Sequence, residues 1–313
     1  MRALSALAWA TAFFTFVLLT VGGSVHATGS SLACPDWPLC HGELMPEMTG
    51  GVEFEHTHRL LGTLVGLLTI AVTVLCWRGG KRDPLLRRLG VAALVIVVVQ
   101  GVMGGVTVLL RLSLPVSMAH LATSMLFLGL LGLIAWRAGS REWSTGAPED
   151  LAAHRRGVLW VLALVYAQIL LGGLVRHTTS GSVCGDDPIL CAGFLWPPYW
   201  RGQLQMVHRV VAVIVLLVAM RVMIKLALAA VDKGHTTIRA MAWGAIGLLV
   251  AQITLGVVTV MTLLEVVSVT AHLSVAALLL MDLAGTYVLL RPPVTVGECV
   301  PERRALADGS SAP

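Results

Sequence analysis

The chain has 313 residues, of which 57% are hydrophobic and 12% are charged. A soluble domain of this size cannot bury so much apolar surface, so lipid must solvate part of it. The formal net charge of +5 follows from the loop charges described below, and it needs no nucleic-acid partner to explain it.

Eight apolar runs dominate the sequence. A helix needs roughly 20 apolar residues to span about 30 Å of hydrocarbon. Runs of this kind lie near residues 4–25, 57–77, 89–110, 116–136, 157–177, 204–228, 238–261 and 267–290. They are too long and too uniformly apolar for barrel strands, so the sequence predicts an all-α polytopic membrane protein with eight transmembrane helices. The first run is long enough to span, and we expect it to be retained as a helix rather than cleaved as a signal.

Lysine and arginine residues are unevenly divided between the loops. Most of them lie in alternate loops, at residues 78–88, 137–156 and 233–239, and in the tail. The loop 26–53 holds none, and the loop 179–202 holds only Arg201. By the positive-inside rule we expect a multi-pass protein of a bacterial-type plasma membrane, with both termini in the cytoplasm and the two long loops outside.

Four of the six cysteines lie in those two outer loops. Cys34 and Cys40 are in the first loop, and Cys184 and Cys191 are in the second. Two pairs confined to the oxidising side favour two short disulfides. A zinc site is the alternative interpretation, although the spacings differ from those of a zinc knuckle.

The chain repeats itself at an offset of about 150 residues. His58 matches His208 and His120 matches His272 (208 − 58 = 150 and 272 − 120 = 152). Further matches join Cys34 to Cys184, Cys40 to Cys191, Arg59 to Arg209, Gln100 to Gln252 and Gly104 to Gly256. The sequence therefore predicts two tandemly repeated, parallel four-helix bundles at 1–137 and 157–291, joined by a cytoplasmic linker at 138–156 and followed by a cytoplasmic tail at 292–313.

Each of the four matched histidines lies within one or two turns of the outer end of its helix. A neutral imidazole in an apolar segment is a suitable axial ligand for haem iron, and two helices of a bundle can bring two imidazoles to one metal. For any single histidine, an interfacial position or a hydrogen bond between helices is the alternative. Because the geometry is repeated, the sequence predicts two haem sites, with His58 and His120 as iron ligands in the first half and His208 and His272 in the second.

An ionisable acid accompanies only the first of these sites. Glu55 lies three residues before His58, on the same helical face, and its counterpart Gln205 cannot carry charge. A carboxylate at the edge of a haem can act as a base or stabilise a developing cation. Its alternative role is an interaction with the helix dipole. Arg59 and Arg209 follow their histidines and are candidates to bind haem propionates or to anchor the helices at the membrane interface.

Several other polar residues have no assigned role. His26 and His177 each follow a Gly-Gly pair, which allows a contact with a propionate or the substrate. Asp282 lies near mid-membrane, where a hydrogen bond to a neighbouring helix is the commoner outcome. His56 is an extra titratable group that we leave without a role.

Three features together closely resemble the haem A synthase family. They are the loop Cys34-Pro-Asp-Trp-Pro-Leu-Cys40-His-Gly, the motif Glu55-x-x-His58-Arg59 and the repeated histidines. The resemblance covers residues 1–291. None of the three features would be specific alone, and their combination is.

The resemblance implies an activity and two occupants. The activity is oxidation of the C8 methyl group of haem O to a formyl group, by successive hydroxylation and loss of water, which gives haem A for cytochrome oxidase. Haem O would be the substrate in the first half, near Glu55, His58 and His120. A permanent haem b would lie between His208 and His272. A haem O synthase and the assembly of a haem-copper oxidase are implied as neighbours.

Two other functions remain open at this point. The main alternative is a two-haem b-type membrane cytochrome that transfers electrons with quinone; the lesser one is a haem transporter or assembly factor without chemistry. The family links the first cysteine pair with activity, but here Cys34 and Cys40 are one residue closer together than Cys184 and Cys191, so the same redox behaviour does not follow. Membrane lipid surrounds the helices, and an oligomer is possible.

Overall fold

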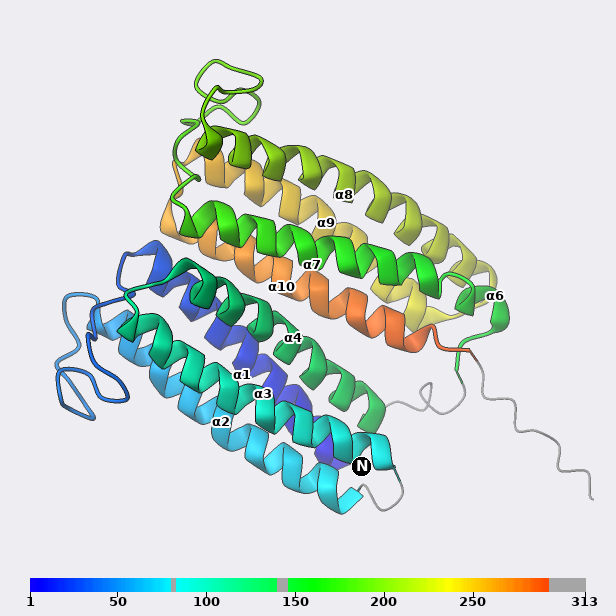
Figure 1. The fold of residues 1–313 in the computed structure, drawn as a ribbon. Coiled ribbons are helices and arrows are strands. Elements are labelled where there is room, and N and C mark those ends of the chain that lie inside the picture. Colours follow the sequence, from blue (N-terminus) through cyan, green and yellow to red (C-terminus); the bar gives the residue numbers. More distant parts are fainter. Residues whose placement is uncertain (80–82, 140–145, 293–313) are drawn as a thin grey trace, which may run out of the picture.

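The computed structural model of the chain describes residues 1–79, 83–139 and 146–292 (Figure 1). Its helices are α1 (Arg2–Ala27), α2 (Val52–Gly79), α3 (Pro84–Leu109), α4 (Leu114–Gly139), α6 (Glu149–Ala152), α7 (Arg155–His177), α8 (Trp200–Asp232), α9 (Thr236–Met261) and α10 (Val266–Leu289). In the described chain eight helical segments, with α6 continued into α7, are long and apolar enough to cross a membrane. This confirms the all-α polytopic fold. The predicted tail lies outside the described residues from residue 293 onward.

Helices α2 and α8 begin before the apolar runs that predicted them. Helix α2 starts at Val52 rather than near residue 57, and α8 starts at Trp200 rather than near 204. Their first turns contain charged and polar residues, which a search for apolar runs misses. His58 and His208 therefore lie about two turns after the start of their helices, further inside than the apolar runs alone suggest.

The segment predicted as a linker, residues 138–156, is partly helical. Helix α4 extends to Gly139, and α6 forms a single turn after Pro148. The acidic residues Glu149 and Asp150 occupy the first turn of α6, where the helix dipole favours negative charge. The side chain of Leu151 is fully buried and ties this turn to the core.

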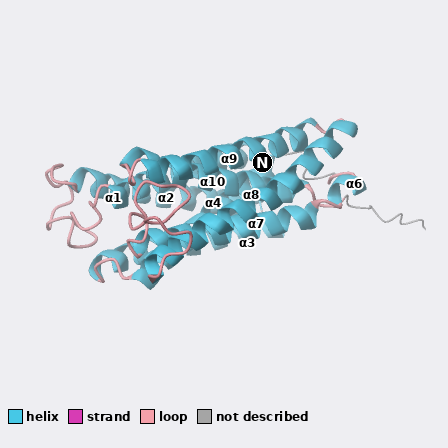
Figure 2. Ribbon diagram, turned by 90° about the horizontal axis from the view of Figure 1, so that it is seen from above, coloured by secondary structure: helices cyan, strands magenta, loops and turns pink. Residues whose placement is uncertain are grey.

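The eight long helices pack in two rings of four. Helices α1 and α3 each contact both α2 and α4, and helices α7 and α9 each contact both α8 and α10. Figure 1 shows α1–α4 on one side and α7–α10 on the other, and Figures 1 and 2 show the long loops at one end of the molecule. We call this end, which carries the four loop cysteines, the cysteine end. The domain boundaries themselves stay a prediction.

The two rings meet along α1, α4, α7 and α10. In this interface a Cβ atom added at Gly23 would lie 2.9 Å from the Leu273 side chain, and one added at Gly173 would lie 2.5 Å from that of Leu121. Gly23 matches Gly173 in the sequence repeat, and Leu273 matches Leu121. In one contact the glycine comes from the first half and the leucine from the second, and in the other contact the reverse holds.

Helices α2 and α3 approach closely at Gly90, and we expect Gly90→Ala to destabilise the fold. The added Cβ atom would lie 2.6 Å from the Cβ atom of Cys76 and 3.5 Å from the Cα atom of Thr73, so a helix must shift. Overpacking of this kind costs about 1–3 kcal/mol, which should lower the melting temperature in detergent. Gly101→Ala on the same helix is the control, because nothing lies within 4 Å of its added Cβ. Equal melting temperatures for the two variants would contradict the prediction.

Candidate functional site

The four predicted iron ligands lie on four different helices, close to the cysteine end. His58 is on α2, His120 on α4, His208 on α8 and His272 on α10, each within about two turns of the start of its helix. His58 is close enough to His120 to interact with it electrostatically, and His208 is close enough to His272 to do the same. The structure thus brings together one pair of imidazoles in each ring of helices.

Each of these imidazoles packs against a glycine of the preceding helix. An added Cβ atom would lie 2.9 Å from the ring Cε1 atom of His58 at Gly22, and 3.0 Å from that of His208 at Gly172. Two further contacts of 3.7 and 3.1 Å pair Gly104 with His120 and Gly256 with His272. A larger residue at Gly22, Gly172 or Gly256 would crowd the ring, so these three glycines fix where the imidazoles lie, whereas an added Cβ at Gly104 would make an ordinary contact.

Buried ring nitrogens without partners fit a metal ligand. The Nδ1 atoms of His58, His120 and His272 are buried and have no hydrogen-bond partner in the described part of the chain. Buried polar atoms normally find one, because an unsatisfied polar group costs about 1–3 kcal/mol. An iron atom bound by these imidazoles would account for nitrogens that the protein leaves unpaired.

Glu55 is buried, with 4% of its surface exposed, and both of its carboxylate oxygens are bonded. Oε1 forms an ion pair of 2.7 Å with Nη2 of Arg59. Oε2 accepts a hydrogen bond of 2.8 Å from the backbone N–H of Cys34. The carboxylate is therefore held in one position between helix α2 and the first cysteine loop, three residues before His58 in the chain.

Arg59 fastens that loop to α2. Its guanidinium donates to the carbonyl oxygens of Cys34 at 3.0 Å, Asp36 at 2.8 Å and Leu39 at 2.5 Å. The backbone N–H groups of Gly42 and His41 donate to the Asp36 carboxylate, and they hold the pKa of Asp36 below its usual range. In this structure the guanidinium of Arg59 forms hydrogen bonds to the loop backbone. Its contact with a haem propionate stays a prediction.

The matching arginine in the second half is left with free donors. Arg209 Nη1 donates to the carbonyl oxygens of Asp187 at 3.0 Å and Leu190 at 3.2 Å. Its Nε and Nη2 groups are buried and have no partner among the described residues. In the first half Glu55 forms an ion pair with Arg59, but the matching residue in the second half is the uncharged Gln205. Arg209 therefore has two N–H groups available for an anion such as a carboxylate.

Both predicted disulfides are present. Cys34 bonds to Cys40, and Cys184 bonds to Cys191. The bonded sulfurs rule out the zinc interpretation for this state of the protein. His56 lies beside the first disulfide, with both ring nitrogens buried and unpartnered in the described structure.

Three further polar residues from the sequence analysis are His26, His177 and Asp282. His26 and His177 meet across the interface of the halves, with ring centroids 4.7 Å apart, and Arg176 donates to the His26 carbonyl oxygen at 3.0 Å. The Oδ2 atom of Asp282 is buried and has no partner among the described residues, so the expected hydrogen bond to another helix is not formed by this atom.

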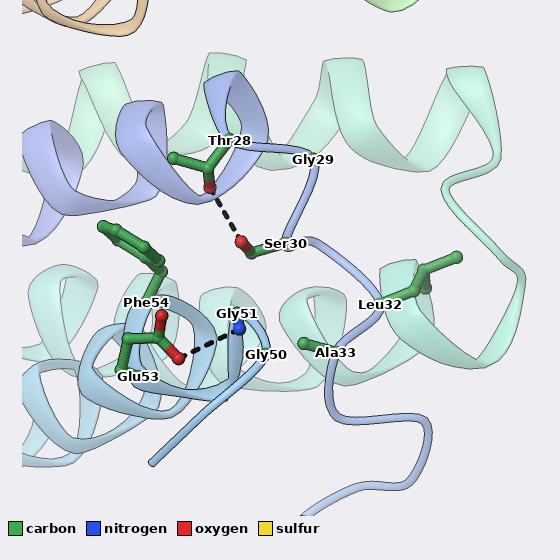
Figure 3. A pocket seen from close by; sticks show the side chains of 9 residues that line it. All are labelled: Thr28, Gly29, Ser30, Leu32, Ala33, Gly50, Gly51, Glu53 and Phe54. Carbon is green, nitrogen blue, oxygen red and sulfur yellow. Dashed lines mark hydrogen bonds between the residues drawn. The ribbon is translucent and has the colours of Figure 1, made fainter.

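A cavity of about 480 Å³ opens at the cysteine end, between the end of α1 and the start of α2 (Figure 3). Figure 3 shows the Thr28 and Ser30 hydroxyl groups bonded to each other on one side, and Glu53 bonded to the N–H of Gly51 on the other. None of the four histidines lines this cavity. It therefore lies beside the candidate site and not within it.

Comparison with known proteins gives one family. The model of the COX15-CtaA family, described as a cytochrome oxidase assembly protein, matches residues 5–53 and 52–284. Proteins named Heme A synthase are similar to the chain. The one from Bacillus pumilus is 29% identical over 68% of this chain and 71% of its own length. Those from Alkalihalophilus pseudofirmus and Symbiobacterium thermophilum are each 30% identical, over 68% and 71% of this chain and 73% and 74% of their own lengths.

The glycine contacts generate a prediction for haem retention. Gly172→Ala should displace the His208 ring, because the new Cβ atom would lie 3.0 Å from it, and we expect roughly tenfold weaker haem binding from such overpacking. The haem content of the purified protein, read from its absorption spectrum, measures this. Gly247→Ala is the control, since nothing lies within 4 Å of its added Cβ. Full haem content in both variants would show that the glycine does not position the ligand.

Proposed function

Because the chain belongs to the COX15-CtaA family of cytochrome oxidase assembly proteins, we propose that it is a haem A synthase that oxidises the C8 methyl group of haem O to a formyl group. The oxidation would proceed by two hydroxylations, each of which adds one oxygen atom to the methyl carbon and removes two electrons from it to an oxidant outside this chain, and the resulting diol would lose water. The iron held by the histidines would supply the redox chemistry, and the protein supplies orientation and charge. The similar proteins named Heme A synthase support this function.

Substrate haem O binds in the first half. His58 and His120 hold the iron there, and the observation that supports the assignment is the buried carboxylate of Glu55, three residues before His58, where the second half has the uncharged Gln205. Glu55 is fixed by Arg59 and by the N–H of Cys34, so its charge costs no reorganisation when positive charge develops at the porphyrin edge. The same oxygens can hold a proton during the reaction.

A resident haem b occupies the second half, between His208 and His272. The free N–H groups of Arg209 support this assignment, because a buried guanidinium is a suitable partner for a propionate. Gln205 cannot carry charge, so this half lacks the group that the reaction requires. The second haem is then a cofactor, and the first is the substrate.

The distribution of lysine and arginine supports an orientation in the membrane. The loops at the cysteine end are poor in both residues, and the loops at the opposite end are rich in them. We place the cysteine end outside the plasma membrane and both termini in the cytoplasm. Both haem sites then lie beneath the outer leaflet, with the disulfides in the oxidising compartment.

We expect Glu55→Gln to abolish haem A formation, by at least about a hundredfold for loss of a charged group at the reacting centre. The resident haem b should be retained, because Glu55 lies in the other half. The test is co-expression with a haem O source, followed by chromatography of the extracted porphyrins. Haem A formation at the wild-type level would remove the catalytic role of Glu55. Haem B alone in the wild-type extract would favour the two-haem cytochrome instead.

The two arginines should have separable roles. Arg209→Leu removes the free N–H groups of the second half, and we expect it to lose most of the resident haem b. Arg59→Leu should keep that haem and reduce haem A formation, because it releases Glu55 and the first cysteine loop. Haem content and porphyrin chromatography of both variants measure the difference. Identical haem loss in both would disprove the division of labour.

A further inference from the structure

A buried histidine with two unused ring nitrogens lies beside the first disulfide. His56 has 5% of its surface exposed, and its Nδ1 and Nε2 atoms have no hydrogen-bond partner in the described part of the chain. Buried polar atoms normally find a partner, and histidine is the commonest metal ligand among side chains. One nitrogen of this ring and the sulfurs of Cys34 and Cys40 all lie within 4.8 Å of one another.

These three groups form a recognised set of metal ligands once the disulfide is reduced. Two thiolates and one imidazole supply three of the four ligands of a tetrahedral zinc site. In the present state the sulfurs of Cys34 and Cys40 are bonded to each other, so the set is incomplete. A dithiol that gives two electrons and two protons to the bond becomes a disulfide itself and leaves two thiols. Each thiol releases its proton when it binds a metal ion, and two thiolates balance the charge of a divalent cation, which lowers the cost of burying it.

The loop that carries both cysteines is fixed by bonds that do not involve the disulfide. Arg59 donates to the carbonyl oxygens of Cys34 and of Leu39, which immediately precedes Cys40. The backbone N–H and carbonyl groups of Cys40 are both paired with Glu43, at 3.1 Å each. We therefore expect the two cysteines to keep their backbone positions when the disulfide opens. A metal site needs ligands that are held in place in this way before the ion arrives.

The second disulfide has a different neighbour. The residue that matches His56 is Met206 (206 − 56 = 150), which packs in one buried cluster with Cys184 and Cys191. Zinc is bound by cysteine, histidine and carboxylate groups, and a thioether is not among its usual ligands. The second loop thus has the two sulfurs and lacks the nitrogen, so it is a control within the same chain.

We propose that the first cysteine loop, when reduced, binds one divalent cation of the zinc class through Cys34, Cys40 and His56, and that the second loop does not. A water molecule completes the tetrahedral set. The first loop then has two alternative states, a disulfide and a metal site, and removal of two electrons from the thiolates expels the cation and restores the disulfide. The proposal concerns this loop and does not depend on the proposed oxidation of haem O.

The experiment uses the full-length, haem-loaded protein in detergent, in which haem occupies the histidine pairs. A water-soluble phosphine, which becomes its oxide, reduces the protein without oxygen, and alkylation with mass spectrometry checks that both cysteine pairs are open. Co²⁺ then serves as a spectroscopic substitute for Zn²⁺. We expect one bound equivalent, with the thiolate charge-transfer and tetrahedral d–d bands of Co²⁺ in the difference spectrum, and its displacement by one equivalent of Zn²⁺. Unreduced protein should bind none.

Two reciprocal variants test the role of the imidazole. His56→Met gives the first loop the residue of the second. Loss of a group that merely orients a ligand costs about 10–100-fold in metal affinity, so loss of the ligand itself should weaken Zn²⁺ binding at least about 100-fold. Met206→His gives the second loop the missing nitrogen, and we expect a second equivalent of Co²⁺ to bind. The melting temperature and the retained haem show whether each variant is folded.

Several results would overturn the proposal. They are cysteines that stay oxidised in the folded protein, reduced wild-type protein that binds no Co²⁺, a folded His56→Met variant with unchanged Zn²⁺ affinity, and wild-type protein that binds one equivalent at each loop. Haem A formation in cells supplied with haem O tests the proposed function separately. If no haem A forms but Co²⁺ binds as expected, the function is wrong and the metal site holds, and the opposite results lead to the opposite conclusion.

Discussion

The packing of each imidazole against a glycine is the constraint on which the rest of the site depends. A histidine inside a tightly packed helical ring can approach the next helix only where that helix has no Cβ atom. Gly22 and Gly172 precede their histidines by the same 36 residues, and Gly104 and Gly256 by the same 16. Each ring therefore packs against a glycine at the matching position of the repeat, and the differences between the halves arise from polar groups around the rings.

One exchange of side chain gives the two halves different electrostatic properties. Where the first half has Glu55, an acid is present and Arg59 is engaged in an ion pair. Where the second half has Gln205, the acid is absent and Arg209 keeps two buried N–H groups without partners. The first half thus holds a balanced ion pair and the second a positive charge without a counter-ion among these residues, although the backbone around them is alike. A single substitution at one position of the repeat can in this way give the two copies of a duplicated site different roles.

The features predicted from the sequence are those that depend on composition and repeat. The helices follow from apolar runs, and the disulfides follow from cysteines confined to the same two loops. The bonds of Arg59 could not be predicted, because they depend on how closely the first cysteine loop approaches α2. Polar first turns also hid the true starts of α2 and α8.

The contacts of Gly23 with Leu273 and of Gly173 with Leu121 have the form of a two-fold symmetric dimer interface. Each half contributes one glycine and one leucine at matching positions. The surface of one half is therefore complementary to a copy of itself. A single four-helix unit with this surface could associate with an identical subunit through the same glycines. Fusion of two such subunits into one polypeptide would preserve the interface and free each copy to diverge, which a homodimer encoded by one gene cannot do.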